Sequence, residues 1–146
     1  MKKSHLALAG LAILGLIATV VAADKSESAN EGVFIHISHG AEDPHRVLMA
    51  LNMADMMSNS HDVLVYFDIK AVGVVLKESE EMTYSHFPSL ITQLSALHEK
   101  GVTLMACPGC LKSAGKTQSD LAPNVELANK ENFFSFTKGR ILTLDY

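Results

Sequence analysis

The sequence predicts one α/β domain, a three-layer sandwich in which helices cover both faces of a mostly parallel sheet. Short apolar runs rich in β-branched residues alternate with longer segments whose apolar residues recur at helical spacing. Successive positions of the short runs are apolar, as expected for strands buried on both faces. Strands of this kind, alternating with helices, are typical of a parallel sheet covered on both sides.

The N-terminal segment has the order of a secretory signal peptide. Lys2 and Lys3 precede an uncharged apolar run from Leu6 to Ala23, and the sequence turns polar at Asp24. Small residues end the apolar run, so we expect cleavage after Ala23 and removal of residues 1–23. The alternative is an uncleaved membrane anchor, because the run is just long enough to cross a bilayer.

The mature chain is expected to consist of a flexible polar leader, residues 24–31, and a folded domain, residues 32–146. Cleavage would leave an acidic product that is free of the membrane. We expect it to be exported to the periplasm or to another compartment outside the reducing cytosol.

The elements of the domain follow from apolar patterning and from helix start and stop signals. Asp43 and Pro44 suit the cap and first position of a helix, and Gly101 suits a helix end. Strands are expected at 33–37, 63–67, 72–76, 102–106 and 141–144, with a short segment at 124–127. Helices are expected at 44–58, 88–100, 107–115 and 130–137.

The two longest helices differ in their apolar faces. In the helix at 88–100, one stripe is expected to be buried, formed by Phe87, Leu90, Ile91, Leu94 and Leu97. The helix at 44–58 is apolar nearly all round, so we expect it to be covered on more than one side, with self-association as the natural cover. Its four methionines are interpreted as core residues rather than as a copper site.

Composition limits the function. The chain is 48% hydrophobic and 19% charged, which indicates one compact domain rather than a disordered chain or a two-domain enzyme. The formal net charge of -4 leaves no basic surface for a nucleic acid. Two cysteines are too few for a disulfide-stapled scaffold, so their role is local.

Polar and reactive residues follow three of the expected strands. Ser38, His39 and Gly40 follow the first strand, Asp68 follows the second, and Cys107 follows the strand at 102–106. Ligand sites of parallel sheets lie outside the carboxyl ends of the strands. The sequence therefore predicts a site at this edge.

The motif Cys107-Pro108-Gly109-Cys110 lies between a strand and a helix. Unpaired backbone N–H groups at the start of that helix would favour the thiolate of Cys107 and make it a nucleophile. Cys110, one turn later, could attack a sulfur held on Cys107 or close a disulfide with it. The alternative is an inert disulfide that pins the turn.

Metal binding is a second alternative. His36, His39, His45 and His86 could join Cys107 as ligands for copper or zinc. However, His36 can equally be a buried, hydrogen-bonded strand residue, and His45 can face water. A single C-x-x-C also lacks the second pair of a structural zinc site, so the preferred interpretation has neither metal nor cofactor.

Several segments resemble the DsrE/DsrF-like family of small α/β sulfur-relay proteins over about residues 32–146. They are residues 33–40 with Glu42-Asp43-Pro44, the helix with Ala50-Leu51 and Ala54, residues 63–67, Gly73-Val74, Leu97 with Lys100-Gly101-Val102, Ala106 to Cys110, Asp120-Leu121 and residues 133–144. The resemblance implies a flavodoxin-like sandwich, assembly into trimers or hexamers, and a persulfide carried on Cys107 with Cys110 as an additional thiol.

The resulting hypothesis is an exported sulfur-relay or thiol-redox protein with Cys107 and Cys110 at its centre. His39 and His86 would stabilise the anion or shuttle a proton, and Asp68 would orient one of them. Its partners would be further copies of the chain and a protein that donates or accepts sulfur. A soft-metal binding protein and a non-catalytic oligomeric adaptor are the alternatives.

Overall fold

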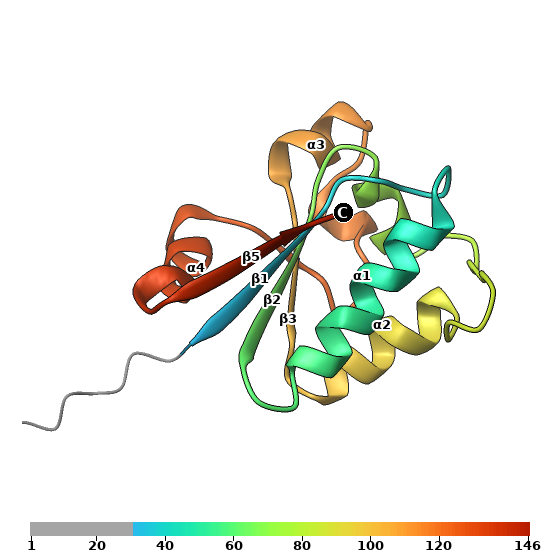
Figure 1. The fold of residues 1–146 in the computed structure, drawn as a ribbon. Helices are drawn as coiled ribbons and strands as arrows, with labels where there is room; N and C mark the ends of the chain where they lie inside the picture. The colour runs from blue at the N-terminus through green and yellow to red at the C-terminus, as the bar shows by residue number, and fades with distance from the viewer. Residues whose placement is uncertain (1–30) are drawn as a thin grey trace, which may run out of the picture.

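The computed structural model describes residues 31–146 and contains a five-stranded sheet in the order β4-β3-β2-β1-β5 (Figure 1). All neighbouring strands pair in parallel. The strands are β1 Gly32–Ile37, β2 Asp62–Phe67, β3 Thr103–Ala106, β4 Glu126–Leu127 and β5 Ile141–Asp145. The expected signal peptide, residues 1–23, and all of the leader except Glu31 lie outside the described residues.

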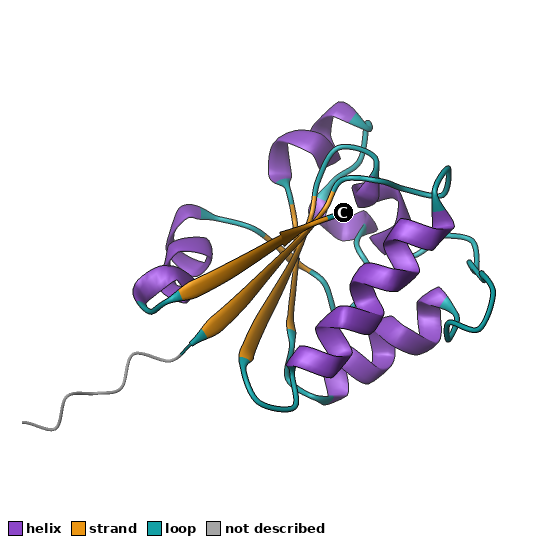
Figure 2. Cartoon of the chain, viewed as in Figure 1, coloured by secondary structure: helices purple, strands orange, loops and turns teal. Residues whose placement is uncertain are grey.

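Helices lie on both faces of the sheet (Figure 2). On one face are α1 Pro44–Met57 and α2 Leu90–Glu99, and on the other is α4 Lys130–Ser135, which continues into η3 Phe136–Lys138. The short helix α3 Pro108–Ser113 stands beyond the carboxyl end of β3. The α/β sandwich and the mostly parallel sheet predicted from the sequence are therefore confirmed.

The larger core fills the space between the sheet and helices α1 and α2. Ile35, Val65 and Phe67 point into it from the strands and are fully buried, as are Leu48 and Leu51 of α1. A smaller cluster lies on the α4 face. Its members are the buried Leu64, Met105 and Ala128 and the partly buried Phe34, Tyr66, Phe133 and Phe136.

Helix α1 begins as the sequence predicts, because the Asp43 carboxylate accepts a hydrogen bond from the Arg46 backbone N–H and Pro44 is the first helical residue. The helix packs on β1, β2 and α2. Its apolar circumference is thus covered on more than one side within the chain, by the sheet and by α2. Met53 and Met57 pack against the core, whereas Met56 is 57% exposed.

The strand expected at 72–76 is wrong: residues Ala71–Val75 form the 3₁₀ helix η1. Val72, Val74 and Val75 are all buried, so the run is as apolar as a buried strand and its pattern cannot distinguish the two. A turn decides the structure, because the Ala71 N–H donates to the Asp68 carbonyl oxygen at 2.8 Å and leads the chain away from the sheet.

In α2 the expected apolar stripe is only partly correct. Leu90, Leu94 and Leu97 are buried, but Ile91 is 50% exposed. Gln93 is buried instead, and its amide nitrogen donates to the carbonyl oxygens of Pro88 and Leu48. A polar residue therefore joins α2 to α1. Within residues 31–146, no helix combines the length and hydropathy needed to cross a membrane.

Candidate functional site

The carboxyl ends of β1, β2 and β3 lie side by side and bring their loops together. His36 pairs with Tyr66 across β1 and β2, and Tyr66 pairs with Met105 across β2 and β3. Asp68 lies two positions after Tyr66, and Cys107 lies two positions after Met105. Because side chains alternate along a strand, Asp68 and Cys107 belong to the same face of the sheet as Tyr66 and Met105. Backbone hydrogen bonds continue the pairing past the strand ends, since the Cys107 N–H donates to the Phe67 carbonyl oxygen at 2.8 Å.

Cys107 caps the first turn of α3. Its sulfur accepts a hydrogen bond from the Cys110 backbone N–H at 3.4 Å, and both cysteines are half-buried free thiols. Pro108 begins the helix, as the sequence indicates, because it has no N–H to satisfy at this position. The C-x-x-C motif thus places the two sulfur-bearing side chains together at the carboxyl edge of the sheet.

The surroundings of Cys107 favour its thiolate. Burial by itself raises the pKa of this thiol. Four hydrogen bonds act against burial: one from the Tyr66 hydroxyl, two from the backbone and side chain of Cys110, and one from the Gly109 backbone. Together they outweigh burial, so the pKa of Cys107 lies below its ordinary value. A thiol with a lowered pKa is a nucleophile closer to neutral pH.

Cys110 is shifted in the opposite direction. Burial raises the pKa of Cys110, and the neighbouring charges of Cys107 and Asp68 raise it further, against a hydrogen bond from the Ile69 backbone. Of the two cysteines, Cys107 is therefore the one that ionises first.

Tyr66 of β2 is the hydroxyl donor to Cys107. Its ring packs among Phe34, His36 and Phe133, with centroid distances of 6.0, 6.0 and 5.1 Å. Burial raises the pKa of Tyr66, and the interactions with Cys107 and with the charge of Asp68 raise it further. The hydroxyl is therefore protonated at neutral pH and acts as a donor.

His36 links three strands beside the cysteines. Its Nε2 lies 2.9 Å from an Asp68 carboxylate oxygen and its Nδ1 lies 2.9 Å from an Asp145 carboxylate oxygen. Ser38 donates to the second Asp68 oxygen, also at 2.9 Å. Burial lowers the pKa of His36, but the hydrogen bonds and charges of Asp68 and Asp145 outweigh it, so the pKa lies above 6.5. Two carboxylates on one imidazole favour the imidazolium ion.

The sequence hypothesis named two histidines, His39 and His86. His39 follows Ser38, and its Nδ1 is buried without a hydrogen-bond partner among the described residues. His86 is exposed in the loop before α2, where it stacks on Phe87 with ring centroids 4.6 Å apart. The carboxylate of Asp68 contacts His36 and Ser38 rather than either of these histidines.

A cleft of about 650 Å³ opens beside the two cysteines. Its walls include Ile69, Lys70 and Val72 from the loop after β2 and η1, and Ser113 and Ala114 from the end of α3. The Lys70 ammonium is paired with Glu42, also in the wall, at 3.2 Å. Partner molecules could therefore approach both sulfurs from this side.

Two backbone features shape the cleft. At Gly40 a Cβ would lie 2.7 Å from the Lys70 carbonyl oxygen, so glycine is what lets the loops after β1 and β2 meet. Ile69 has a φ of 47°, a left-handed conformation that is strained for a β-branched residue, and its side chain is 61% exposed.

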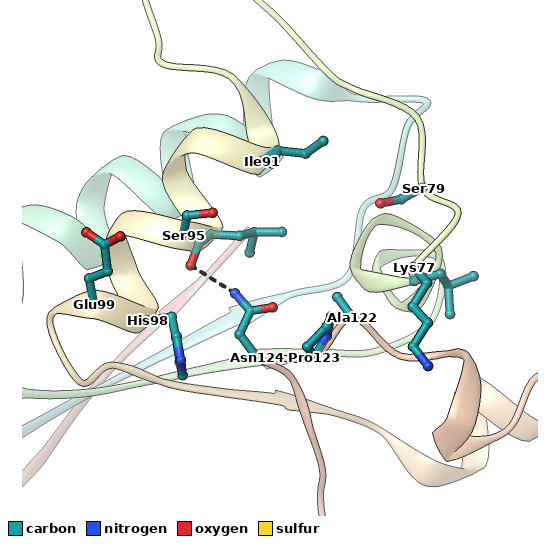
Figure 3. A pocket seen from close by; sticks show the side chains of 11 residues that line it. Lys77, Ser79, Ile91, Ser95, His98, Glu99, Ala122, Pro123 and Asn124 are labelled. Carbon is teal, nitrogen blue, oxygen red and sulfur yellow. Dashed lines mark hydrogen bonds between the residues drawn. The ribbon is translucent and has the colours of Figure 1, made fainter.

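A second hollow, of about 520 Å³, lies between α2 and the segment before β4 (Figure 3). Asn124 reaches across it and donates to the Leu94 carbonyl oxygen at 3.2 Å. Its wall contains His98 but neither cysteine. Residues 31–146 contain no group of three or more His, Cys, Asp or Glu that could hold a metal ion. We therefore take the cysteine cleft as the candidate site.

The sequence model of the DsrE/DsrF-like family matches residues 31–138. The chain belongs to the DsrE/DsrF-like family. No curated protein matches it in sequence.

The flavodoxin-like architecture expected for a DsrE-like protein is also found in solved structures. The protein of unknown function MTH1491 from Methanobacterium thermoautotrophicum superposes with a TM-score of 0.57 at 20% identity, over 79% of this chain and 99% of that one. YchN from E. coli gives a TM-score of 0.56 at 18% identity, over the same fractions. At these identities the likeness concerns the fold alone.

Three residues of this DsrE-like site were not assigned to it from the sequence: Tyr66, His36 and Asp145. The sequence contains a pattern that could have indicated Tyr66 and His36. Tyr66 stands two positions before Asp68, and His36 stands two positions before Ser38. A spacing of two puts side chains on one face of a strand. No sequence pattern indicates Asp145, because its role depends on the pairing of β5 with β1, a contact between the two ends of the domain.

Proposed function

We propose that this DsrE-family protein carries sulfane sulfur on Cys107. The observation that carries the proposal is the set of donors around one sulfur: the Tyr66 hydroxyl and the Cys110 backbone N–H both stabilise the anion of Cys107. A persulfide anion on Cys107 could use the same donors after small movements. The adjacent cleft gives a donor or acceptor access to that sulfur.

In the loading step, the Cys107 thiolate attacks the outer sulfur of a donor persulfide, R–S–SH. A new S–S bond forms on Cys107 as the S–S bond of the donor breaks. The electron pair of the broken bond leaves with the donor as R–S⁻, which takes a proton from solvent or from a nearby acid. Cys107 then holds the persulfide, and no external oxidant or reductant is consumed.

Cys110 provides one route by which the sulfane sulfur can leave Cys107. Its thiolate can attack the inner sulfur of the Cys107 persulfide, forming the Cys107–Cys110 disulfide and releasing HS⁻. The persulfide is reduced and the dithiol is oxidised in this step. Because the pKa of Cys110 is raised, this route is slow at neutral pH, and transfer of the outer sulfur to an acceptor thiolate competes with it.

The setting of this chemistry is also proposed. The N-terminal pattern of Lys2, Lys3 and the apolar run to Ala23 supports export to the periplasm. Assembly with further copies of the chain, and a sulfur-donating or sulfur-accepting protein as partner, are proposed from the family resemblance of the sequence.

Mass spectrometry of the protein after treatment with glutathione persulfide tests the proposal. Cys107 and Cys110 are separated by only two residues, so a peptide that contains both is ambiguous, and single-cysteine variants are needed to place the sulfur. We expect one added sulfur atom in Cys110→Ser and none in Cys107→Ser. The wild type should convert slowly to the disulfide.

Alkylation before treatment shows whether the Cys107 thiol was available in Cys110→Ser. If this thiol reacts fully with iodoacetamide but takes up no sulfur from the persulfide, the proposal is wrong. Uptake by Cys107→Ser equal to that by Cys110→Ser would also contradict it, because the donors described above surround only Cys107.

A further inference from the structure

Ile69, in the wall of the cysteine cleft, is poorly suited to its position in the fold. Its φ of 47° lies in the left-handed region, which glycine and asparagine tolerate and which strains a β-branched residue. Its side chain is 61% exposed, so burial offsets little of that strain. The stability of the fold therefore gives no reason for an isoleucine at this position.

Backbone hydrogen bonds on either side of Ile69 hold this turn in place. The N–H of Asp68 donates to the Ile37 carbonyl oxygen at 3.1 Å, and the N–H of Lys70 donates to the Ser38 carbonyl oxygen at 3.2 Å. Strained residues persist where the surrounding structure fixes them, and they are concentrated at sites that bind ligands. The turn thus holds the Ile69 backbone in a defined position at the sheet edge.

This turn lies beside the strand end that carries Cys107. The N–H of Cys107 donates to the Phe67 carbonyl oxygen at 2.8 Å, and Ile69 follows Phe67 by two residues. Ile69, Cys107 and Cys110 all line the same cleft. A molecule whose sulfur reaches Cys107 through this cleft therefore places the group bound to that sulfur near Ile69.

The rest of the cleft wall suits an uncharged molecule. Val72, Gly73 and Ala114 add apolar surface. Among the described residues of the wall, the charged ones are Lys70 and Glu42, which pair with each other at 3.2 Å. The volume of about 650 Å³ is in the range of small-molecule sites. An apolar group therefore fits this cleft better than an anionic one, which would have to compete with Glu42 for the ammonium.

We propose that Ile69 is a specificity-determining residue that selects small persulfides R–S–SH with an uncharged, apolar group R as the donors to Cys107. This inference rests on the proposed function and names its substrate class. In the exchange, the Cys107 thiolate takes the outer sulfur, and the electron pair of the broken S–S bond leaves with R–S⁻. Contact between R and Ile69 holds the donor sulfur beside Cys107 while this exchange takes place.

The test compares n-butyl persulfide with glutathione persulfide, which is anionic, in the Cys110→Ser background. Mass spectrometry of quenched samples gives the rate at which Cys107 gains one sulfur atom from each donor. The ratio of the n-butyl rate to the glutathione rate is then compared between variants, so that the intrinsic reactivity of each donor cancels. We expect Ile69→Asn, which tolerates the left-handed turn, to lower this ratio by about threefold or more, the effect of losing the burial of one methylene group.

Two further variants separate specificity from stability. Ile69→Val, which stays apolar and branched, should keep most of the parent ratio. Ile91→Asn is the matched control, because Ile91 is also half-exposed, at 50%, but lines the hollow that contains neither cysteine. It should leave the ratio unchanged. A looser fold would change the rates with both donors alike and would not alter their ratio.

A second pair of reagents separates failure of this inference from failure of the carrier function. n-Butyl methanethiosulfonate and its anionic 2-sulfonatoethyl analogue label a reactive thiolate by displacing methanesulfinate, and they need no persulfide. If neither persulfide loads Cys107, the carrier function fails, and a labelling ratio that falls in Ile69→Asn still supports the apolar preference. The inference is overturned if the ratio is the same with Ile and with Asn at position 69, measured with the persulfides where sulfur loads and with the labels where it does not. It is equally overturned if Ile91→Asn lowers the ratio as much as Ile69→Asn.

Discussion

The two faces of the sheet differ in what they bury. On the α1 and α2 face, Ile35, Val65 and Phe67 are fully buried in an aliphatic core. On the α4 face, the positions nearest the carboxyl ends of the strands are His36, Tyr66 and, past the strand ends, Asp68 and Cys107, which are all partly exposed. Among residues 31–146, the short helix α4 and its continuation η3 cover this face. One face therefore mainly stabilises the fold, and the other carries the reactive side chains at the carboxyl edge of the sheet.

Phe67 and Tyr66 are adjacent in β2 and point to opposite faces, so substitutions at these two positions test the difference most directly. Phe67 is fully buried on the core face, so Phe67→Ala should lower the free energy of unfolding by about 3–5 kcal/mol through lost burial and a cavity. Urea denaturation of Phe67→Ala beside Tyr66→Phe measures this. A similar loss in both variants would show that the two faces contribute equally to stability.

Tyr66→Phe should act on reactivity. The change removes only a hydroxyl, so the free energy of unfolding should fall by less than about 1 kcal/mol. Without that donor, the thiolate of Cys107 is less stable and the pKa of Cys107 rises toward its ordinary value. We expect alkylation of Cys107 near pH 7 to slow several-fold in a Cys110→Ser background. If the pH profile of Cys107 alkylation were the same with Tyr66 and with Phe at this position, Tyr66 would have no role in activating Cys107.

His36 gives a smaller effect, on the pH dependence of stability. The pKa of His36 is raised in the folded protein, so its contribution is fully present below the unfolded value of 6.5 and is lost as pH rises through the folded pKa. Thermal unfolding from pH 6 upward should therefore show a decline in stability that is weaker in His36→Gln. Parallel profiles of the two proteins would contradict the imidazolium assignment.

Most of the fold could be predicted because its signals are local. The strands at 33–37 and 63–67, the cap at Asp43 and the helix after Cys107 agree with the structure to within a residue or two. Residues 72–76 could not be assigned, because an apolar run buried on all sides has no period that separates a strand from a 3₁₀ helix. The prediction that Ile91 is buried was wrong for a related reason: the spacing of apolar residues along a helix does not show how wide the buried face is.

The site was predictable only in part. The C-x-x-C motif and the strand ends indicate Cys107, Cys110 and Asp68 by type and position. The identity of their neighbours is a tertiary property: Tyr66 reaches Cys107 from the adjacent strand, and Asp145 reaches His36 because β5 lies beside β1. The sequence offers four histidines near the strand ends and loops, and only the structure selects His36 as the partner of Asp68.

The backbone at Ile69, beside the cysteine cleft, is strained. A branched side chain in a left-handed turn is higher in energy than glycine would be, and this one also leaves its hydrocarbon in water. The same turn points a backbone N–H at Cys110 and forms one wall of the cleft. The protein is therefore less stable than it would be with a residue that suits this turn, and selection for heat resistance alone would favour replacing Ile69.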